Sequence, residues 1–153
     1  MKPTIYKLIL FVLFTAFIPW MRCRVDPLSP QALQGSWMML TLTNKEDNIT
    51  VNAGEPIDIG DGVTRALQGW LSFDRDFENK NFVWISIFVT TTIPGEGEQV
   101  DEEATSGTYS INESTLTIFD VRTGDAKVFR MNRSQLRLTL EDDESQTTWG
   151  KID

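Results

Sequence analysis

Residues 135–152 read QLRLTLEDDESQTTWGKI, and the pattern in this stretch decides the fold class. A β-strand turns successive side chains to opposite faces, so strict alternation is typical of a half-buried strand. A polar connector at 142–144 separates the alternating part from a second β-rich run, as in an antiparallel hairpin. One face of the first run is apolar and the other is polar: Leu136, Leu138 and Leu140 against Arg137, Thr139 and Glu141.

The same kind of pattern extends back to residue 35, with short polar connectors between β-rich segments. No long stretch has the periodicity of a helix, so the domain is predicted to be all-β. Eight antiparallel strands joined mostly by hairpins can close into an up-and-down barrel, which leaves no open edge; a two-sheet sandwich is the alternative. The predicted strands span 35–43, 64–74, 81–93, 104–112, 115–122, 126–132, 135–141 and 145–152.

Three segments flank or interrupt these strands. Ser29 can cap a short helical turn that begins at Pro30, so residues 24–34 are predicted to be a linker ending in this turn. Residues 44–63 and the acidic segment 94–103 exceed the length of minimal hairpin loops. They are predicted to be long connections, which in compact domains are either functional or disordered.

The predicted strand 81–93 is apolar on both faces, unlike a barrel wall that faces water. We expect its outer face to be covered by the segment 44–63, by a second copy of the chain or by another partner. Burial within one chain is the simplest of these readings. The two faces carry Phe82, Trp84 and Phe88 on one side, and Val83, Ile85, Ile87 and Val89 on the other.

The composition is that of one soluble domain and excludes several functions. The chain has 153 residues, with 22 acidic and 14 basic side chains. Because Lys2, Lys7 and Arg22 lie in the leader, 11 basic residues remain against all 22 acidic ones, a formal charge near −11. Such a domain repels phosphate backbones, so no nucleic-acid partner is expected.

Histidine is absent, and the single cysteine is Cys23. The domain after it therefore cannot build a Ser-His-Asp or Cys-His nucleophile, or a zinc site with nitrogen and sulfur ligands. We expect a protein that is not an enzyme and holds no metal or other cofactor. Acidic clusters remain, and they are read as solvated turns rather than calcium ligands or a catalytic carboxylate pair.

The N-terminal segment is typical of an export signal. Lys2 and Lys7 precede an apolar run over 8–20 that is too short to span a membrane comfortably. Residues 1–23 are therefore predicted to be a signal peptide that directs the domain to the periplasm or cell envelope. Cys23 stands where a bacterial lipoprotein carries its lipid, so either a lipid anchor or an unmodified cysteine in the leader is expected.

A short motif carries a family resemblance. Residues 33–37 (LQGSW) place a Gly-x-Trp motif at the start of the first strand, directly after the helical turn. With the strand count, the long first connection and the segments 107–111 (GTYSI) and 116–118 (LTI), residues 35–153 resemble the lipocalin-like β-barrel domains of bacteria.

The resemblance implies a barrel with one closed end and an interior that binds a small hydrophobic molecule. In such domains the tryptophan closes the floor beneath a basic side chain from the last strand, which implies that role for Trp37 and Lys151. The alternative is a structural or interaction module that uses the outer face of strand 81–93, expected to carry Val83, Ile85 and Ile87, including self-association. The candidate ligand-lining residues are Leu71, Phe73, Tyr109, Ile118 and Leu138.

Overall fold

The computed structural model describes residues 26–75 and 78–152. The predicted signal peptide, including Cys23, lies outside these residues. A four-residue helix is followed by ten strands: α2 (Pro30–Leu33), β1 (Gly35–Asn44), β2 (Ile49–Asn52), β3 (Ile57–Gly60), β4 (Val63–Arg75), β5 (Asn81–Ile93), β6 (Gly97–Asn112), β7 (Thr115–Asp120), β8 (Ala126–Ser134), β9 (Arg137–Glu141) and β10 (Ser145–Ile152).

Eight of the strands close into an antiparallel barrel. Strands β4 to β10 pair in sequence order, and β1 pairs with β10 on one side and β4 on the other. Closure between β1 and β4 runs over residues 35–38 and 70–73. The predicted up-and-down barrel, with a helical turn before β1, is therefore confirmed, and a two-sheet sandwich is excluded.

The segment 44–63 completes the wall instead of covering it. Beyond their four paired residues, β1 and β4 diverge, and β2 and β3 pair with their free edges. Two backbone bonds bridge the gap: Ala53 N–H donates to Leu40 O at 2.8 Å, and Gly54 N–H donates to Leu67 O at 2.7 Å. Segment 44–63 thus fills the gap between the diverging parts of β1 and β4.

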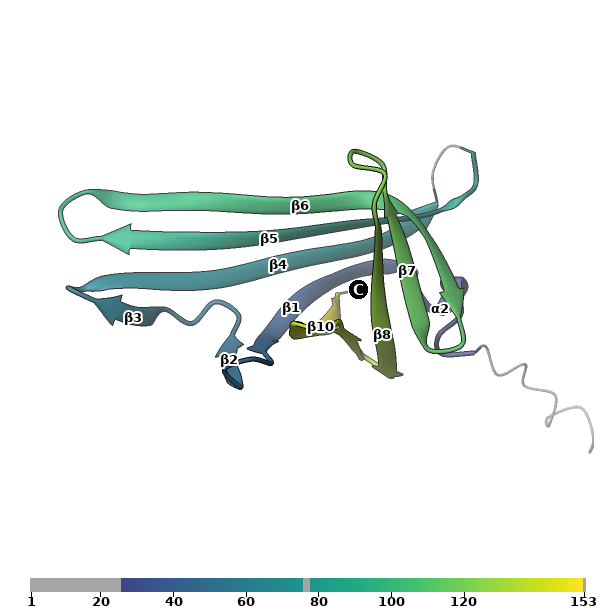
Figure 1. Cartoon of the computed structure of the whole chain (residues 1–153), viewed down its shortest axis with the longest axis horizontal. Coiled ribbons are helices and arrows are strands. Elements are labelled where there is room, and N and C mark those ends of the chain that lie inside the picture. The colour runs from purple at the N-terminus through teal and green to yellow at the C-terminus, as the bar shows by residue number, and fades with distance from the viewer. Residues whose placement is uncertain (1–25, 76–77, 153) are drawn as a thin grey trace, which may run out of the picture.

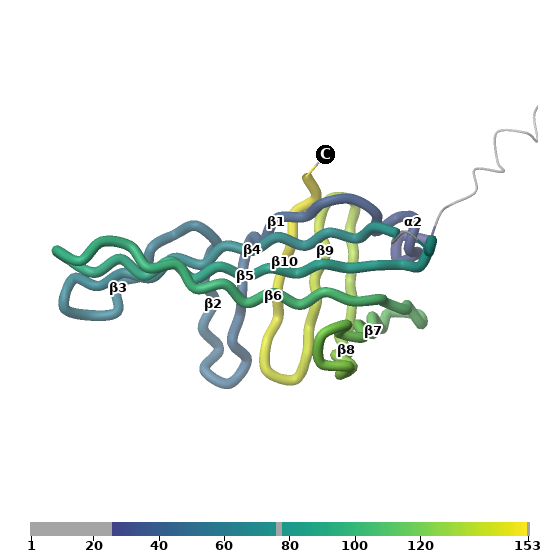
Figure 2. The backbone as a smooth tube through the Cα atoms, turned by 90° about the horizontal axis from the view of Figure 1, so that it is seen from above, coloured from purple at the N-terminus to yellow at the C-terminus, as the bar shows by residue number. Residues whose placement is uncertain are grey.

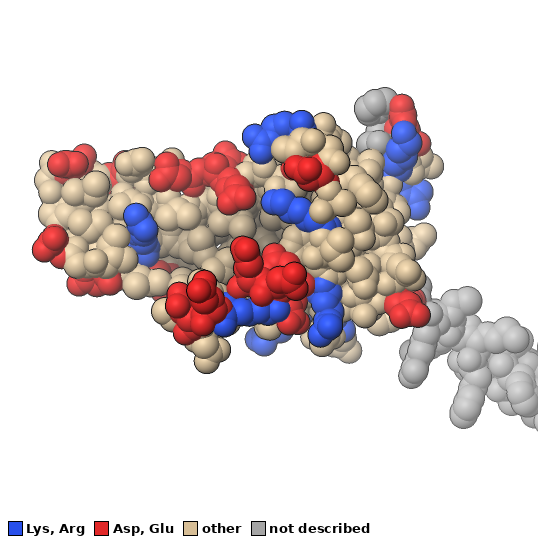
Figure 3. Space-filling view, in the orientation of Figure 1, with Lys and Arg blue, Asp and Glu red and all other residues tan. Residues whose placement is uncertain are grey.

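Three strands continue far beyond the barrel and form an arm (Figures 1 and 2). The arm consists of residues 63–68 of β4, 88–93 of β5 and 97–102 of β6, with β3 along one edge. The expectation of a long loop at 94–103 is wrong, because the turn occupies only 94–96 and β6 begins at Gly97. Figure 3 shows acidic side chains along the arm, and those of Glu98 and of residues 101–103 do not prevent pairing, because they are exposed to water.

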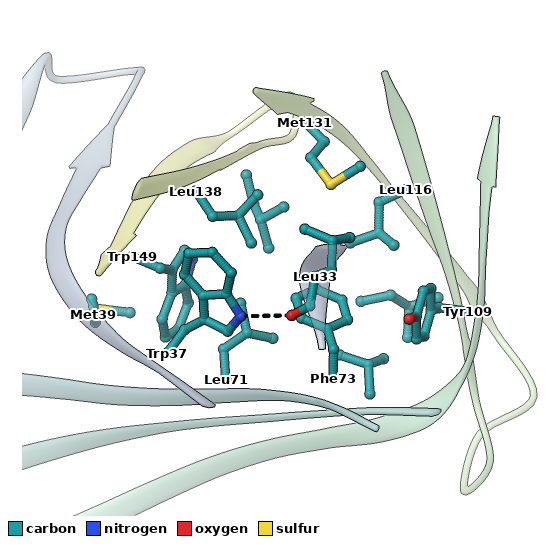
Figure 4. Packing of buried hydrophobic residues seen from close by; sticks show 13 residues of the cluster. Leu33, Trp37, Met39, Leu71, Phe73, Tyr109, Leu116, Met131, Leu138 and Trp149 are labelled. Atoms are coloured by element: carbon teal, nitrogen blue, oxygen red, sulfur yellow. Dashed lines mark hydrogen bonds between the residues drawn. The ribbon is translucent and has the colours of Figure 1, made fainter. Parts of the chain in front are cut away.

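The core fills the end of the barrel near α2 (Figure 4). Strand faces supply the core because inward residues recur at every second position. Leu136 departs from the predicted alternation: it lies in the turn before β9 and is 63% exposed. The buried apolar residues are Leu33, Trp37, Met39, Leu71, Phe73, Val83, Tyr109, Leu116, Ile118, Met131, Leu138, Leu140 and Trp149.

Strand β5 has a clear inner and outer face. Val83 is fully buried, and Ile85 and Ile87 pack against the core, so this set faces the barrel interior, and the expectation that these three residues form the outer face is wrong. Trp84 lies on the outer face and is 53% exposed. The expectation that segment 44–63 covers that outer face is therefore wrong, since its two strands extend sheet edges instead.

Candidate functional site

The closed end of the barrel is built around Trp37. Its indole is fully buried, and its Nε1–H donates to Leu33 O at 3.0 Å, which ties β1 to α2 (Figure 4). Lys151 Nζ lies 5.6 Å from the indole centroid, within the range of a cation–π contact. The register explains this placement, because Trp37 and Lys151 are directly paired across β1 and β10.

Arg133 is a second cation at the same ring, and sequence reasoning missed it. Its guanidinium carbon lies 5.5 Å from the Trp37 centroid, and its Nη1–H donates to Pro27 O at 2.7 Å. Burial lowers the pKa of Arg133 by desolvation. Its place in the strand pairing could have indicated this role: Arg133 lies opposite Leu138, an inward residue, so Arg133 also faces inward.

The opposite end of the barrel holds a cavity of about 510 Å³. Its position follows from the two-residue repeat along each strand. On β9 and the following turn, Leu138 lies in the core, Leu140 in the cavity wall and Asp142 at the rim. On β5, Val83 and then Ile85 follow the same course from core to cavity wall.

Eight of the fifteen residues that line the cavity are apolar, and the other seven, which include Thr105 and Thr147, are polar or charged. This composition matches ligand sites in general, which are concave and largely hydrophobic, with volumes of roughly 300–1,000 Å³. Gly69 helps to place the indole of Trp149 in the wall, because a Cβ at position 69 would lie 3.2 Å from that ring and 2.8 Å from Met39 Cε. The apolar wall residues are Leu42, Ile85, Ile87, Ile118, Val128, Phe129, Leu140 and Trp149.

The rim of the cavity is charged. Glu103 on β6 and Asp142 and Glu144 in the β9–β10 turn line it, together with a single amine, Lys127 on β8. Lys127 Nζ lies 3.5 Å from Thr105 Oγ1. Among residues 26–75 and 78–152, no carboxylate lies within ion-pair distance of Lys127. The cavity therefore joins an apolar wall to a mouth with more negative than positive groups.

Asp142 is held by its own turn. Its Oδ1 accepts from Glu144 N at 3.0 Å, from Ser145 N at 2.7 Å and from Ser145 Oγ at 3.1 Å. Lys45 donates to the Asp142 carbonyl and forms an ion pair with Glu141 at 2.8 Å. The same contact lowers the pKa of Glu141. Lys45 is thus engaged by the turn backbone and Glu141.

The predicted ligand-lining residues fall into two groups. Ile118 lines the cavity. Leu71, Phe73, Tyr109 and Leu138 belong to the packed core beneath it, with Phe73 and Tyr109 in edge-to-face contact at 5.1 Å. On β9 the next inward residue after Leu138 is Leu140, which does line the cavity, whereas no residue of β4 lines it.

Tyr109 is a polar side chain inside this packed half. Its hydroxyl is buried and has no hydrogen-bond partner within the described part of the chain. Desolvation by burial is the main cause that raises its pKa to about 12; Arg75 opposes the shift and Asp74 adds to it. The phenol therefore stays neutral at all physiological pH values.

The described residues contain neither a metal-binding group nor a membrane-spanning helix. Over 26–75 and 78–152, no group of three or more acidic side chains converges closely enough to hold a metal ion. In the same ranges no helix is long and apolar enough to cross a membrane.

The fold and cavity define a class: a closed eight-stranded antiparallel barrel, compatible with a lipocalin-like fold, with one packed end and one hollow end. No protein-family model matches the sequence, and no curated protein or solved structure is significantly similar to it.

Proposed function

We propose that this chain is an exported, lipocalin-like binding protein that holds a small apolar molecule at the hollow end of its barrel. The observation that carries the proposal is the cavity of about 510 Å³ with an apolar wall. Burying the apolar surface of a ligand there contributes about 25 cal/mol per Å² removed from water. The proposal assigns no catalytic residue.

The separation of the two ends supports this function. The floor around Trp37 is tightly packed and stabilises the barrel, so the hollow end does not need to be filled by side chains. A ligand site on paired strands is also rigid, which reduces the entropy lost on binding.

Binding of the uncharged fluorophore N-phenyl-1-naphthylamine tests the proposal. We expect saturable binding that Ile87→Trp weakens at least tenfold, because Ile87 lines the cavity and an indole would fill it. Phe88→Trp is the matched control, since it places the same indole at the next residue of β5 but on the outer face. Equal binding by both variants, or no saturable binding by the parent protein, would overturn the proposal.

The natural ligand can be sought directly. We expect native mass spectrometry of the protein purified from its own host to show a small molecule in complex with it. The Ile87→Trp variant should lose this added mass.

A second candidate function is an interaction surface for another copy of the chain. Three large apolar side chains on adjacent strands of the outer wall favour it: Met38, Trp70 and Trp84, which are 45%, 49% and 53% exposed. Met38 and Trp70 are directly paired across β1 and β4. Light scattering should show a dimer that becomes monomeric in Trp70→Ser/Trp84→Ser; a monomeric parent protein excludes this candidate.

A further inference from the structure

The charge at the cavity mouth carries an inference about the class of ligand. Glu103, Asp142 and Glu144 come from two separate parts of the barrel and line one opening, and Lys127 is the single cation among the lining residues. An apolar molecule in the cavity would place its polar end at this opening. The charge of that polar end therefore decides whether the rim attracts or repels the molecule.

We propose that the cavity selects an apolar molecule with a positively charged head, of the alkylammonium class. This inference rests on the proposed binding function and deepens it. The carboxylates outnumber the amine, and they do not converge into a chelating group, so they suit a monovalent organic cation rather than a metal ion.

The cations near the rim do not offset its net negative charge. Two further cations lie near the β9–β10 turn: Lys45 is paired with Glu141 and bonded to the turn backbone, and Arg130 lies opposite Glu141 across β8 and β9. Lys127 Nζ lies 3.5 Å from Thr105 Oγ1 on β6, which is separated from β8 by β7 alone. The Oδ1 atom of Asp142 is occupied by three hydrogen bonds, which fix the carboxylate in place.

Three ligands with the same ten-carbon chain test the inference: decylamine, decanol and decanoate, below their micelle concentrations at pH 7. Each displaces bound N-phenyl-1-naphthylamine. We expect decylammonium to bind about tenfold more tightly than decanol and decanoate about tenfold more weakly, a difference of about 1.4 kcal/mol per step. Raising the salt concentration should shrink both differences.

Variants connect the preference to the rim. Glu103→Gln should reduce decylammonium affinity three- to tenfold and leave decanol binding unchanged. Lys127→Gln should weaken decanoate and strengthen decylammonium. Glu98→Gln is the matched control, because Glu98 is on the same strand as Glu103 but out on the arm, away from the cavity.

The outcomes separate this inference from the proposed function. Equal affinity for all three ligands, or tightest binding of decanoate, overturns the cation preference and leaves the binding function standing. A preference for decylammonium that survives Glu103→Gln and Glu144→Gln together also overturns it. If none of the three ligands displaces the probe and the probe itself does not bind, the proposed function fails.

Discussion

The Arg133 guanidinium and the Trp37 indole, 96 positions apart in the chain, lie 5.5 Å from each other at the closed end of the barrel. Lys151 approaches the same ring at 5.6 Å. Arg133 also bonds to Pro27 O and so joins the segment before α2 to β8. The floor is thus a junction of β1, β8, β10 and the N-terminal turn, and its strength can be measured.

We expect Arg133→Met to lower the free energy of unfolding by about 1–2 kcal/mol, because it removes a cation–π contact and a hydrogen bond from a charged donor. Lys151→Met should cost less, about 0.5–1 kcal/mol, since it removes the cation–π contact alone. Urea unfolding followed by tryptophan fluorescence measures both. Arg130→Met, at an exposed position of the same strand, is the control; a loss there equal to that of Arg133→Met would contradict a special role for the floor.

Stability at high pH should depend on Tyr109. Its folded pKa of about 12 lies above the usual value near 10, so the folded state holds the proton more tightly. This contribution is fully present below about pH 10 and is lost as pH rises toward 12, by about 2–3 kcal/mol.

Tyr109→Phe isolates that contribution. At pH 7 the variant should be as stable as the parent protein or slightly more, because the buried hydroxyl makes no hydrogen bond. Between pH 10 and 12 the parent should lose more stability than the variant, and lysine titration, common to both, cancels in the comparison. Parallel pH profiles for the two proteins would contradict the prediction.

Gly107 is required where β6 approaches β7. A Cβ at this position would lie 1.9 Å from Phe119 O, so the backbone itself would have to move. We expect Gly107→Ala to destabilise the fold by about 3 kcal/mol or more, as overpacking of a rigid site does. Ser106→Ala, its neighbour, is the control, and thermal unfolding by circular dichroism distinguishes them. Similar melting temperatures would show that the strands can separate there.

The outer edge of the arm should be protected by its charges. Residues 97–105 of β6 pair with β5 on one side, and no strand pairs with them on the other within the described chain. Charged edge strands resist pairing with other molecules. Glu98→Val/Glu102→Val should therefore promote association, seen as thioflavin T binding. Glu98→Lys/Glu102→Lys, which keeps the edge charged, should not promote association. If both variants associate, the acidic side chains themselves, and not charge in general, protect the edge.

The sequence by itself determined the eight wall strands and the all-β class. Alternation such as that of Leu138 and Leu140 is a local property, because side chains two apart share a face in any strand. The role of Trp37 at the end of a barrel was implied by a motif and its position after a helical turn. Neither inference needed knowledge of how the sheet closes into a barrel.

Tertiary structure alone decided which inward residues meet a cavity. Leu138 and Leu140 have the same pattern in sequence, but Leu138 lies in the packed half and Leu140 in the cavity wall, since Trp37 and α2 fill only one end. The contact of the second cation, Arg133, with Trp37 also follows only from the tertiary structure. Register between distant strands sets these contacts, and register depends on closure of the whole barrel rather than on any local segment.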